Sequence, residues 1–287
     1  MKGIALAIYV VAVVGCGPDP RPRGGDDNGD DDGTTDAATN GDCAMGTESI
    51  YTVDQFANRI SRFDPPSKTF TDLGAPVCAT MAGATPFSMS VDRNAVAWVL
   101  YSSGELFKVA LPGLTCTKTN WASPLGLHVF GMGFSTDEPG GSAETLWIGG
   151  GSSQMLGSYV LAKVDTTTMA ATMVGTEPQL PEMTGTGNAE LWGFFPDASM
   201  PKVVKFDKTN GSLATSYPLP TLAGTMTGYA FAHWGGDYWV FLLKNGETST
   251  TVYQVSGMTG MITSTTPAPG RTIVGAGVST CAPVVVF

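Results

Sequence analysis

Apolar and polar positions alternate along much of this chain, and five short apolar segments recur at a nearly constant spacing. Each segment is centred on one aromatic residue: Tyr51, Trp98, Trp147, Trp192 and Trp239. Successive members of this set lie 47, 49, 45 and 47 residues apart. The segments are short and rich in Val, Leu, Ile and Phe, which predicts buried strands rather than helices. We name this predicted element strand B of each repeat.

Further strand-like segments surround each aromatic segment. After it come an apolar–x–[KRQ]–apolar stretch, a turn of Asp, Pro, Gly, Thr or Asn, and an alternating Thr-rich stretch, which together predict a hairpin of strands C and D. Before it lies a short stretch in which small residues flank a central one, and we expect this stretch to be strand A. The central residues are Met89, Met132, Phe231 and Ala276. The matching stretch of the fourth repeat, residues 181–188 (PEMTGTGN), is short and Gly-rich.

A repeat of about 40–50 residues made of strands is typical of a β-propeller with one blade per repeat. The sequence therefore predicts an all-β fold, a five-bladed β-propeller of four-stranded antiparallel blades over residues 47–287. The last strand A, residues 273–280, has no strand B after it, and the first strand B, at Tyr51, has no strand A before it. We expect these two to pair, so that the C-terminal strand closes the ring and leaves only short sheet edges. The five aromatic residues are then core residues between blades.

The first 15 residues predict a signal peptide, because the apolar run at 3–14 follows Lys2 and is too short to span a membrane. The run ends in Val13-Val14-Gly15-Cys16, which resembles the lipobox of bacterial lipoproteins. The resemblance implies cleavage before Cys16, lipidation of that residue with acyl chains such as palmitate, and an extracytoplasmic anchor in a bacterial membrane. The alternative is an ordinary secretory signal followed by an incidental cysteine.

Residues 16–46 predict a disordered acidic linker between the lipidated cysteine and the propeller. Eight Asp and two Arg at 17–46 give a charge of −6, out of −10 for the whole chain. The propeller region is only mildly acidic, which argues against nucleic acid as a partner.

Four cysteines remain besides Cys16, and in an exported chain an even number predicts disulfides. Four cysteines allow three pairings, and the repeat map favours one of them. Cys43 precedes the first strand B, and Cys281 ends the strand A that is expected beside it. That leaves Cys78, between the first two repeats, for Cys116 on the outer strand of the second.

The sequence offers few groups for catalysis. Its two histidines, His128 and His233, are expected toward opposite faces of the propeller, roughly 20 Å apart at ~3.3 Å per strand residue. No motif of a serine hydrolase, zinc protease or P-loop occurs, and we predict no catalytic residue, metal site or cofactor. Ligand contacts are expected on the face formed by the D–A and B–C connections, because these are the longest and most varied. The candidates there are Trp121, His128, Asn58, Asp197 and Lys244.

The segment NRISRFDP at residues 58–65, preceded by YTVD at residues 51–54, is similar to the repeat of NHL-type and virginiamycin B lyase-like propellers. This resemblance covers the repeat core of all five blades and implies the fold. Lyases of that type use a histidine and acidic residues around a metal, but those residues do not map onto this chain, and their ring is expected to be larger. The order of signal, lipobox, acidic spacer and propeller resembles that of bacterial envelope lipoproteins.

Two functions from different classes follow. The first is a non-enzymatic binding or scaffolding module on a lipid anchor in the cell envelope, with an unknown protein or carbohydrate as its ligand. The alternative is an extracellular hydrolase or lyase that acts on a polysaccharide or similar substrate at the central mouth of the propeller. Acids or histidine gathered at one mouth would favour the enzyme, and apolar or small residues there would favour binding.

Overall fold

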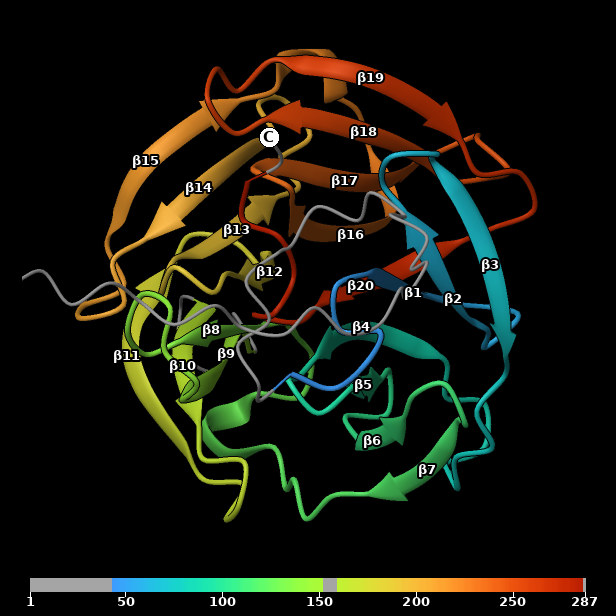
Figure 1. Ribbon diagram of the computed structural model, residues 1–287, viewed down its shortest axis with the longest axis vertical. Coiled ribbons are helices and arrows are strands. Elements are labelled where there is room, and N and C mark those ends of the chain that lie inside the picture. Colours follow the sequence, from blue (N-terminus) through green and yellow to red (C-terminus); the bar gives the residue numbers. More distant parts are fainter. Residues whose placement is uncertain (1–42, 152–158, 286–287) are drawn as a thin grey trace, which may run out of the picture. The chain divides into compact units, whose positions relative to one another are not determined.

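The strands pair in five antiparallel sheets of four, arranged around a central axis (Figure 1). The computed structural model describes residues 43–151 and 159–285, which lie in the second of the chain's two units, Ala37–Phe287. The fold is therefore the predicted five-bladed β-propeller. The predicted signal peptide, the lipidation site Cys16 and most of the predicted linker lie outside the described residues.

Each blade runs from an inner strand at the axis to an outer strand at the rim, and two short 3-10 helices, η1 and η2, lie in the connections. From the inner to the outer strand, blade 1 is β20 (Ile273–Val278), β1 (Ile50–Asp54), β2 (Ile60–Asp64) and β3 (Thr69–Gly74); blade 2 is β4 (Pro86–Val91), β5 (Val96–Tyr101), β6 (Leu106–Ala110) and β7 (Thr115–Lys118); blade 3 is β8 (Phe130–Thr136), β9 (Glu144–Gly150), β10 (Tyr159–Val164) and β11 (Ala171–Glu177). Blade 4 is β12 (Glu182–Gly185), β13 (Leu191–Phe195), β14 (Lys202–Phe206) and β15 (Leu213–Pro218); blade 5 is β16 (Met226–Trp234), β17 (Asp237–Lys244), β18 (Thr251–Ser256) and β19 (Ile262–Pro267); η1 is Pro124–Gly126 and η2 is Pro220–Leu222.

The C-terminal strand closes the ring. Strand β20 pairs antiparallel with β1, with Thr52 opposite Ala276 and Ile50 opposite Val278. This confirms the predicted pairing of the two unmatched strands, and it gives blade 1 the same four-stranded form as the other blades.

The five periodic aromatic residues fill the interfaces between blades, as predicted. Each is at most 5% exposed and lies on the second strand of its blade. Each also packs in a separate cluster of buried residues that joins its blade to the next one around the ring. In the cluster between blades 2 and 3, for example, Trp98 meets Phe134 edge-on, with ring centroids 5.8 Å apart. The period of the sequence is therefore the period of the blade interfaces.

The [KRQ] position of each repeat lies directly opposite the aromatic residue. The pairs across the second and third strands are Tyr51–Arg62, Trp98–Lys108, Trp147–Lys163, Trp192–Lys205 and Trp239–Gln254. Facing side chains in an antiparallel pair are close enough to interact, and an ammonium is attracted to an aromatic face. The Lys108 ammonium lies 4.2 Å from the Trp98 ring centroid. This pairing gives the repeated polar residue a structural role.

Inner strands approach each other too closely for a side chain at several positions. A Cβ on Gly133 of β8 would lie 2.7 Å from Thr184 Cα of β12. A Cβ on Gly275 of β20 would lie 2.6 Å from Met89 N of β4. Small residues in the predicted inner strands therefore allow the backbones to converge on the axis.

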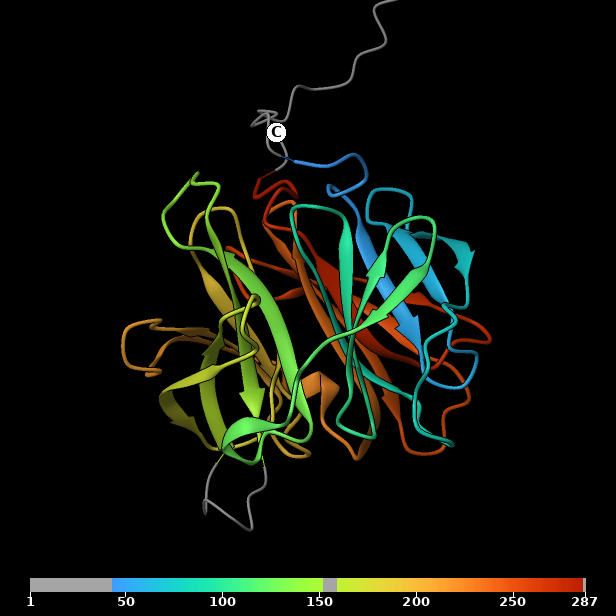
Figure 2. The same cartoon turned by 90° about the horizontal axis from the view of Figure 1, so that it is seen from below.

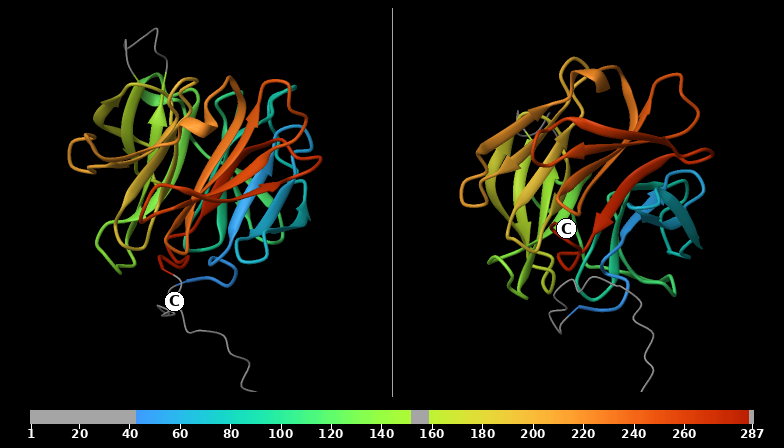
Figure 3. Two further views of the ribbon diagram at one scale, coloured as in Figure 1. Left: turned by 90° about the horizontal axis from the view of Figure 1, so that it is seen from above. Right: turned by 45° about the horizontal axis from the view of Figure 1, so that its top comes forward.

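The blades present two faces (Figures 2 and 3). We call the face with the turns from first to second and from third to fourth strands the A–B face, and the opposite one the B–C face. Cys43, the first described residue, and the segment after β20 lie on the A–B face, whereas η1 and η2 lie on the B–C face.

Two disulfides join the predicted partners. Cys43 bonds to Cys281 across a sequence separation of 238 residues, and Cys78 bonds to Cys116 across 38. Structural disulfides form and persist in oxidising compartments, so they indicate an extracytoplasmic environment. Among residues 43–151 and 159–285, no helix is long and apolar enough to cross a membrane.

We expect the Cys43–Cys281 bond to stabilise the propeller more than the Cys78–Cys116 bond. A cross-link removes more entropy from the unfolded chain when it closes a longer loop, which corresponds to about 5 kcal/mol for the first bond and about 4 kcal/mol for the second. Denaturant unfolding without reductant should therefore show a greater loss of the free energy of unfolding for Cys43→Ser/Cys281→Ser than for Cys78→Ser/Cys116→Ser. The reverse order would show that ring closure does not depend on the terminal bond.

Candidate functional site

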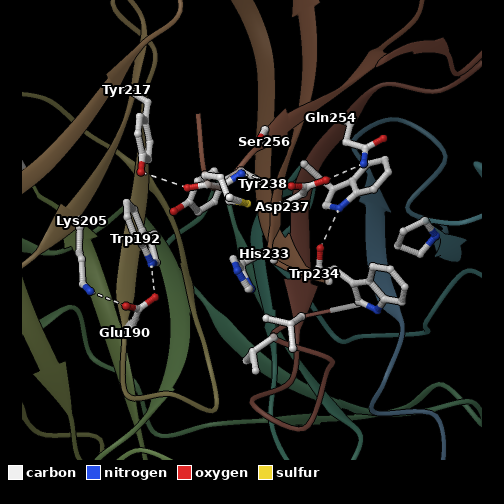
Figure 4. A pocket seen from close by; sticks show the side chains of 18 of the residues that line it. Glu190, Trp192, Lys205, Tyr217, His233, Trp234, Asp237, Tyr238, Gln254 and Ser256 are labelled. Atoms are coloured by element: carbon white, nitrogen blue, oxygen red, sulfur yellow. Dashed lines mark hydrogen bonds and ion pairs between the residues drawn. The ribbon is translucent and has the colours of Figure 1, made fainter. Parts of the chain in front are cut away.

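A pocket of about 890 Å³ opens on the A–B face, where blades 4, 5 and 1 meet (Figure 4). We call it the seam pocket. Its volume is in the range of small-molecule sites. Blade 5 supplies most of the lining, with contributions from blades 4 and 1 and from the segment after β20. The lining includes Lys68, Glu190, Trp192, Lys205, Tyr217, His233, Trp234, Gly235, Gly236, Asp237, Tyr238, Gln254, Gly257, Val284 and Val285.

His233 places an imidazole in the centre of the pocket view (Figure 4). Strand β16 positions it, because the His233 backbone N–H donates to Thr184 Oγ1 of blade 4 at 3.2 Å, and its ring meets Tyr238 edge-on. Among the contacts of the described residues, none is a hydrogen bond to the imidazole. Burial lowers the pKa of His233 to about 4, against the opposing effect of the charges on Glu190 and Asp237. The ring is therefore neutral at pH 7, with one donor and one acceptor nitrogen.

Glu190, Trp192 and Lys205 form a fixed group on the blade 4 side. Glu190 Oε2 accepts from Trp192 Nε1 at 3.1 Å, and Glu190 Oε1 accepts from Lys205 Nζ. Burial alone would raise the pKa of Glu190, but these hydrogen bonds and the Lys205 charge hold it below its ordinary value. Tyr217 stacks on Trp192 at 6.1 Å, and the Lys205 ammonium lies 5.5 Å from the same ring. The Trp192 indole is thus already in contact with protein groups.

Asp237 and Gln254 form the matching group on the blade 5 side. Gln254 Nε2 donates to Asp237 Oδ2 at 2.7 Å, and Gly257 N donates to Asp237 Oδ1 at 3.2 Å. The hydroxyl of Tyr217 donates to Gly257 O at 3.0 Å, which ties the outer strand of blade 4 to the turn of blade 5. These bonds fix the orientation of the Asp237 carboxylate at the pocket wall.

Both ends of the described chain help to build the pocket. Trp234 Nε1 donates to Glu48 O at 2.6 Å, and Gly235 N donates to Pro283 O at 2.7 Å. Val284 and Val285 line the pocket beside these contacts. The pocket is therefore complete only when the ring is closed.

A buried polar cluster fixes the segment after β20. The Arg93 guanidinium donates to Gly141 O, Thr280 Oγ1 and Cys43 Sγ, and the Thr280 hydroxyl donates to Glu144 Oε2 at 2.7 Å. Burial raises the pKa of Glu144 to about 7, although hydrogen bonds from Arg93 N and Thr280 act against it. The cluster connects blades 2 and 3 to the two segments that carry Cys43 and Cys281, the partners of the terminal disulfide.

The ligand residues expected from the sequence lie on the opposite face and do not line this pocket. Asn58 donates to Pro76 O and accepts from Tyr101 Oη, and Lys244 Nζ donates to Ala223 O. Both residues therefore hold connections of the B–C face together. A ligand role for them stays a prediction.

The remaining three candidates are also on the B–C face. Trp121 is buried against Phe130, whereas His128 is exposed after η1. Asp197 accepts three hydrogen bonds from Ser199 and Met200 within its own loop, and these hold the pKa of Asp197 well below its ordinary value. Among the described residues, no hydrogen bond, ion pair or ring contact joins two of the five candidates. As expected, His128 and His233 lie toward opposite faces.

Sequence reasoning missed the groups around His233, although one signal pointed to them. In the fourth and fifth repeats an acidic residue stands two positions before the tryptophan, as Glu190 before Trp192 and Asp237 before Trp239. Residues two apart on a strand share a face, so acid, aromatic and [KRQ] partner gather at one spot. What the sequence did not show was that blades 4 and 5 present these spots to one pocket.

Comparisons with known proteins show similarity of fold only. No protein-family profile matches the chain, and no curated protein matches its sequence. Solved structures with a similar chain trace include a luciferin-regenerating enzyme (12% identity, TM-score 0.46, 81% of this chain and 76% of that one) and a calcium-binding regucalcin from Agrobacterium tumefaciens (14%, 0.43, 82% and 75%). The Kuenenia stuttgartiensis hydrazine synthase is a third (14%, 0.40, 73% and 60%). At these values the site must be interpreted from its own residues.

We expect His233 to make the stability of the protein depend on pH below 6.5. The folded imidazole, with a pKa of about 4, stays neutral while the unfolded one, with an ordinary value of 6.5, takes up a proton. Since the unfolded state binds more protons, this group lowers the free energy of unfolding by about 2 kcal/mol between pH 7.5 and 5. His233→Gln should remove that component.

The measurement is denaturant unfolding of wild type, His233→Gln and His128→Gln at both pH values. Burial raises the pKa of Glu144 and Glu177, which acts in the opposite direction, but all three proteins share that contribution. His128→Gln should change with pH as wild type does. Equal pH dependence of wild type and His233→Gln would mean that the imidazole is not buried in its neutral form.

Proposed function

We propose that this protein is a lipid-anchored, non-enzymatic binding module of the bacterial cell envelope, and that its ligand occupies the seam pocket. The observation that carries the proposal is the state of the pocket's titratable groups. Burial keeps the His233 imidazole neutral, and hydrogen bonds fix the carboxylates of Glu190 and Asp237, which suits recognition of a ligand better than proton transfer.

Proton transfer needs groups whose pKa lies near the working pH. Burial moves the pKa of His233 to about 4, too low for an effective base near neutrality. Glu190 is held ionised by Lys205 and Trp192, so it is a poor general acid. Asp237 already accepts from Gln254 and Gly257. Two acids and a histidine do gather here, but between blades and not at the central mouth, and the state of these groups supports binding over the alternative, a hydrolase or lyase acting on polysaccharide.

The location of the pocket fits an anchored module. Cys43, the described residue that follows the predicted linker, lies on the A–B face, the same face as the pocket. A linker over residues 17–42 would span at most about 90 Å. The proposed ligand is therefore a component of the envelope within that distance of the membrane that holds Cys16.

Cys16→Ser tests the anchor. Expressed in a bacterial host, the wild-type protein should be found in the membrane fraction, and the variant should be released or should remain as an unprocessed precursor. Fractionation followed by intact-mass measurement of the N-terminal fragment reports both the processing and the acyl chains. Unchanged membrane partitioning of Cys16→Ser, or a wild-type fragment without acyl mass, would contradict lipidation at this residue.

Retention on isolated cell envelopes tests the pocket. The soluble Cys16→Ser chain should be retained, and adding His233→Ala should lower retention at least tenfold, because it removes the central hydrogen-bonding group. Met173→Ala, at an exposed position on the outer strand of blade 3 away from the pocket, is the control and should have no effect. Equal retention of all three would contradict the pocket as the site. Release of sugar fragments that depends on His233 would instead establish the enzymatic alternative.

A further inference from the structure

Among the described residues, the charges that line the seam pocket balance. Lys68 and Lys205 carry two positive charges, Glu190 and Asp237 carry two negative ones, and the His233 imidazole is neutral. Lys205 and Glu190 are in direct contact, which further reduces the field of each. For each wall charge of opposite sign that attracts a charged ligand, another wall charge of the ligand's own sign repels it. The pocket therefore favours an uncharged ligand.

The pocket also offers donors and acceptors side by side. The Lys205 ammonium has donors beyond the one it gives to Glu190, and the carboxylate oxygens of Glu190 and Asp237 have lone pairs beyond those already used. The His233 imidazole adds one donor and one acceptor with no protein partner among the described residues. A ligand with several hydroxyl groups matches this arrangement, because each hydroxyl both donates and accepts.

Trp234 supplies a flat apolar surface beside these polar groups (Figure 4). The ring is half-buried, and its Nε1 bond to Glu48 O fixes its orientation. Trp192, by contrast, is in contact with Tyr217 and Lys205, and Trp239 is buried against Phe63. Among the ring and cation contacts of the described residues, none involves the Trp234 indole.

We propose that the seam pocket binds an uncharged carbohydrate, with the Trp234 indole as the platform for one sugar ring and the His233 imidazole as a hydrogen-bonding partner of its hydroxyls. A pyranose ring combines an apolar C–H face with a rim of hydroxyl groups, and this is the combination that Trp234 and the surrounding polar groups complement. The inference rests on the proposed function, since it names the class of ligand for the same pocket.

The test is calorimetric titration of the soluble Cys16→Ser chain with oligosaccharide probes. The uncharged probes are cellotetraose, laminaritetraose and chitotetraose; the charged counterparts are the chitosan tetramer and tetragalacturonate. At least one uncharged probe should bind, and chitotetraose should bind more tightly than the chitosan tetramer. Failure of all three uncharged probes, or tighter binding of a charged counterpart, overturns the inference.

Variants then locate the binding. His233→Ala and Trp234→Ala should each weaken the affinity at least tenfold. Trp234→Tyr should stay within threefold because it keeps an aromatic face, and the control Met173→Ala, at an exposed position on the outer strand of blade 3, should match the parent chain. Far-ultraviolet circular dichroism checks the fold, and Trp234→Tyr covers the case in which Trp234→Ala does not fold. Affinities unchanged in both His233→Ala and Trp234→Ala overturn the inference.

The envelope assay separates this inference from the function on which it rests. If no sugar binds but envelope retention still depends on His233, the ligand is not an uncharged carbohydrate and the binding function stands. If retention is also independent of His233, both proposals fail.

Discussion

The pairing of β20 with β1 is the interaction on which the rest of this structure depends. It joins the two ends of the propeller and supplies blade 1 with its inner strand. It also completes the cluster in which Ile273 and Ala276 pack with Trp239 between blades 5 and 1. The seam pocket is built at the same place, since Glu48 and Pro283 bond to the blade 5 turn there. Ring closure therefore creates both the stability of the fold and its candidate site.

Close convergence of the inner strands at the axis also determines which polar groups a ligand can reach. Inner-strand side chains bond across the ring, as when the Ser88 hydroxyl of blade 2 donates to Glu182 Oε2 of blade 4. Burial raises the pKa of Glu182 well above its ordinary value, which disfavours its charged form among the inner strands. Ser88 and Glu182 are therefore hydrogen-bonded to each other and are not available to a ligand. The polar groups that reach an open pocket lie off the axis, between blades.

The sequence predicts the architecture well because each repeat must supply the same kinds of residue to a blade interface. A buried aromatic residue, a polar partner opposite it and small inner-strand residues are needed at every blade interface, so they recur with the blade period. The disulfide partners also follow from that map. The pocket does not, because the repeat pattern gives the aromatic and [KRQ] positions of blades 4 and 5 but not the open space between them, and His233 and Trp234 belong to one repeat only. Loop length pointed to the B–C face, whereas the pocket lies where a connection is short.

That short connection distinguishes the blade 4–5 interface from the blade 2–3 interface. In blade 2, Asp92 accepts from Trp98 Nε1 and Lys108 lies over the ring, the same grouping as Glu190, Trp192 and Lys205 in blade 4. Beside blade 2, however, the connection of blade 3 is longer, running over residues 137–143, and its Gly141 accepts from Arg93.

The equivalent connection of blade 5 is only Gly235–Gly236, with φ of 64° and 83°. Two successive residues with positive φ form the tight hairpin turn that glycine adopts without strain. A turn this short leaves the rim of the blade 4–5 interface uncovered. In the same structural grouping Asp92 of blade 2 is buried, whereas Glu190 of blade 4 is partly exposed and lines the pocket.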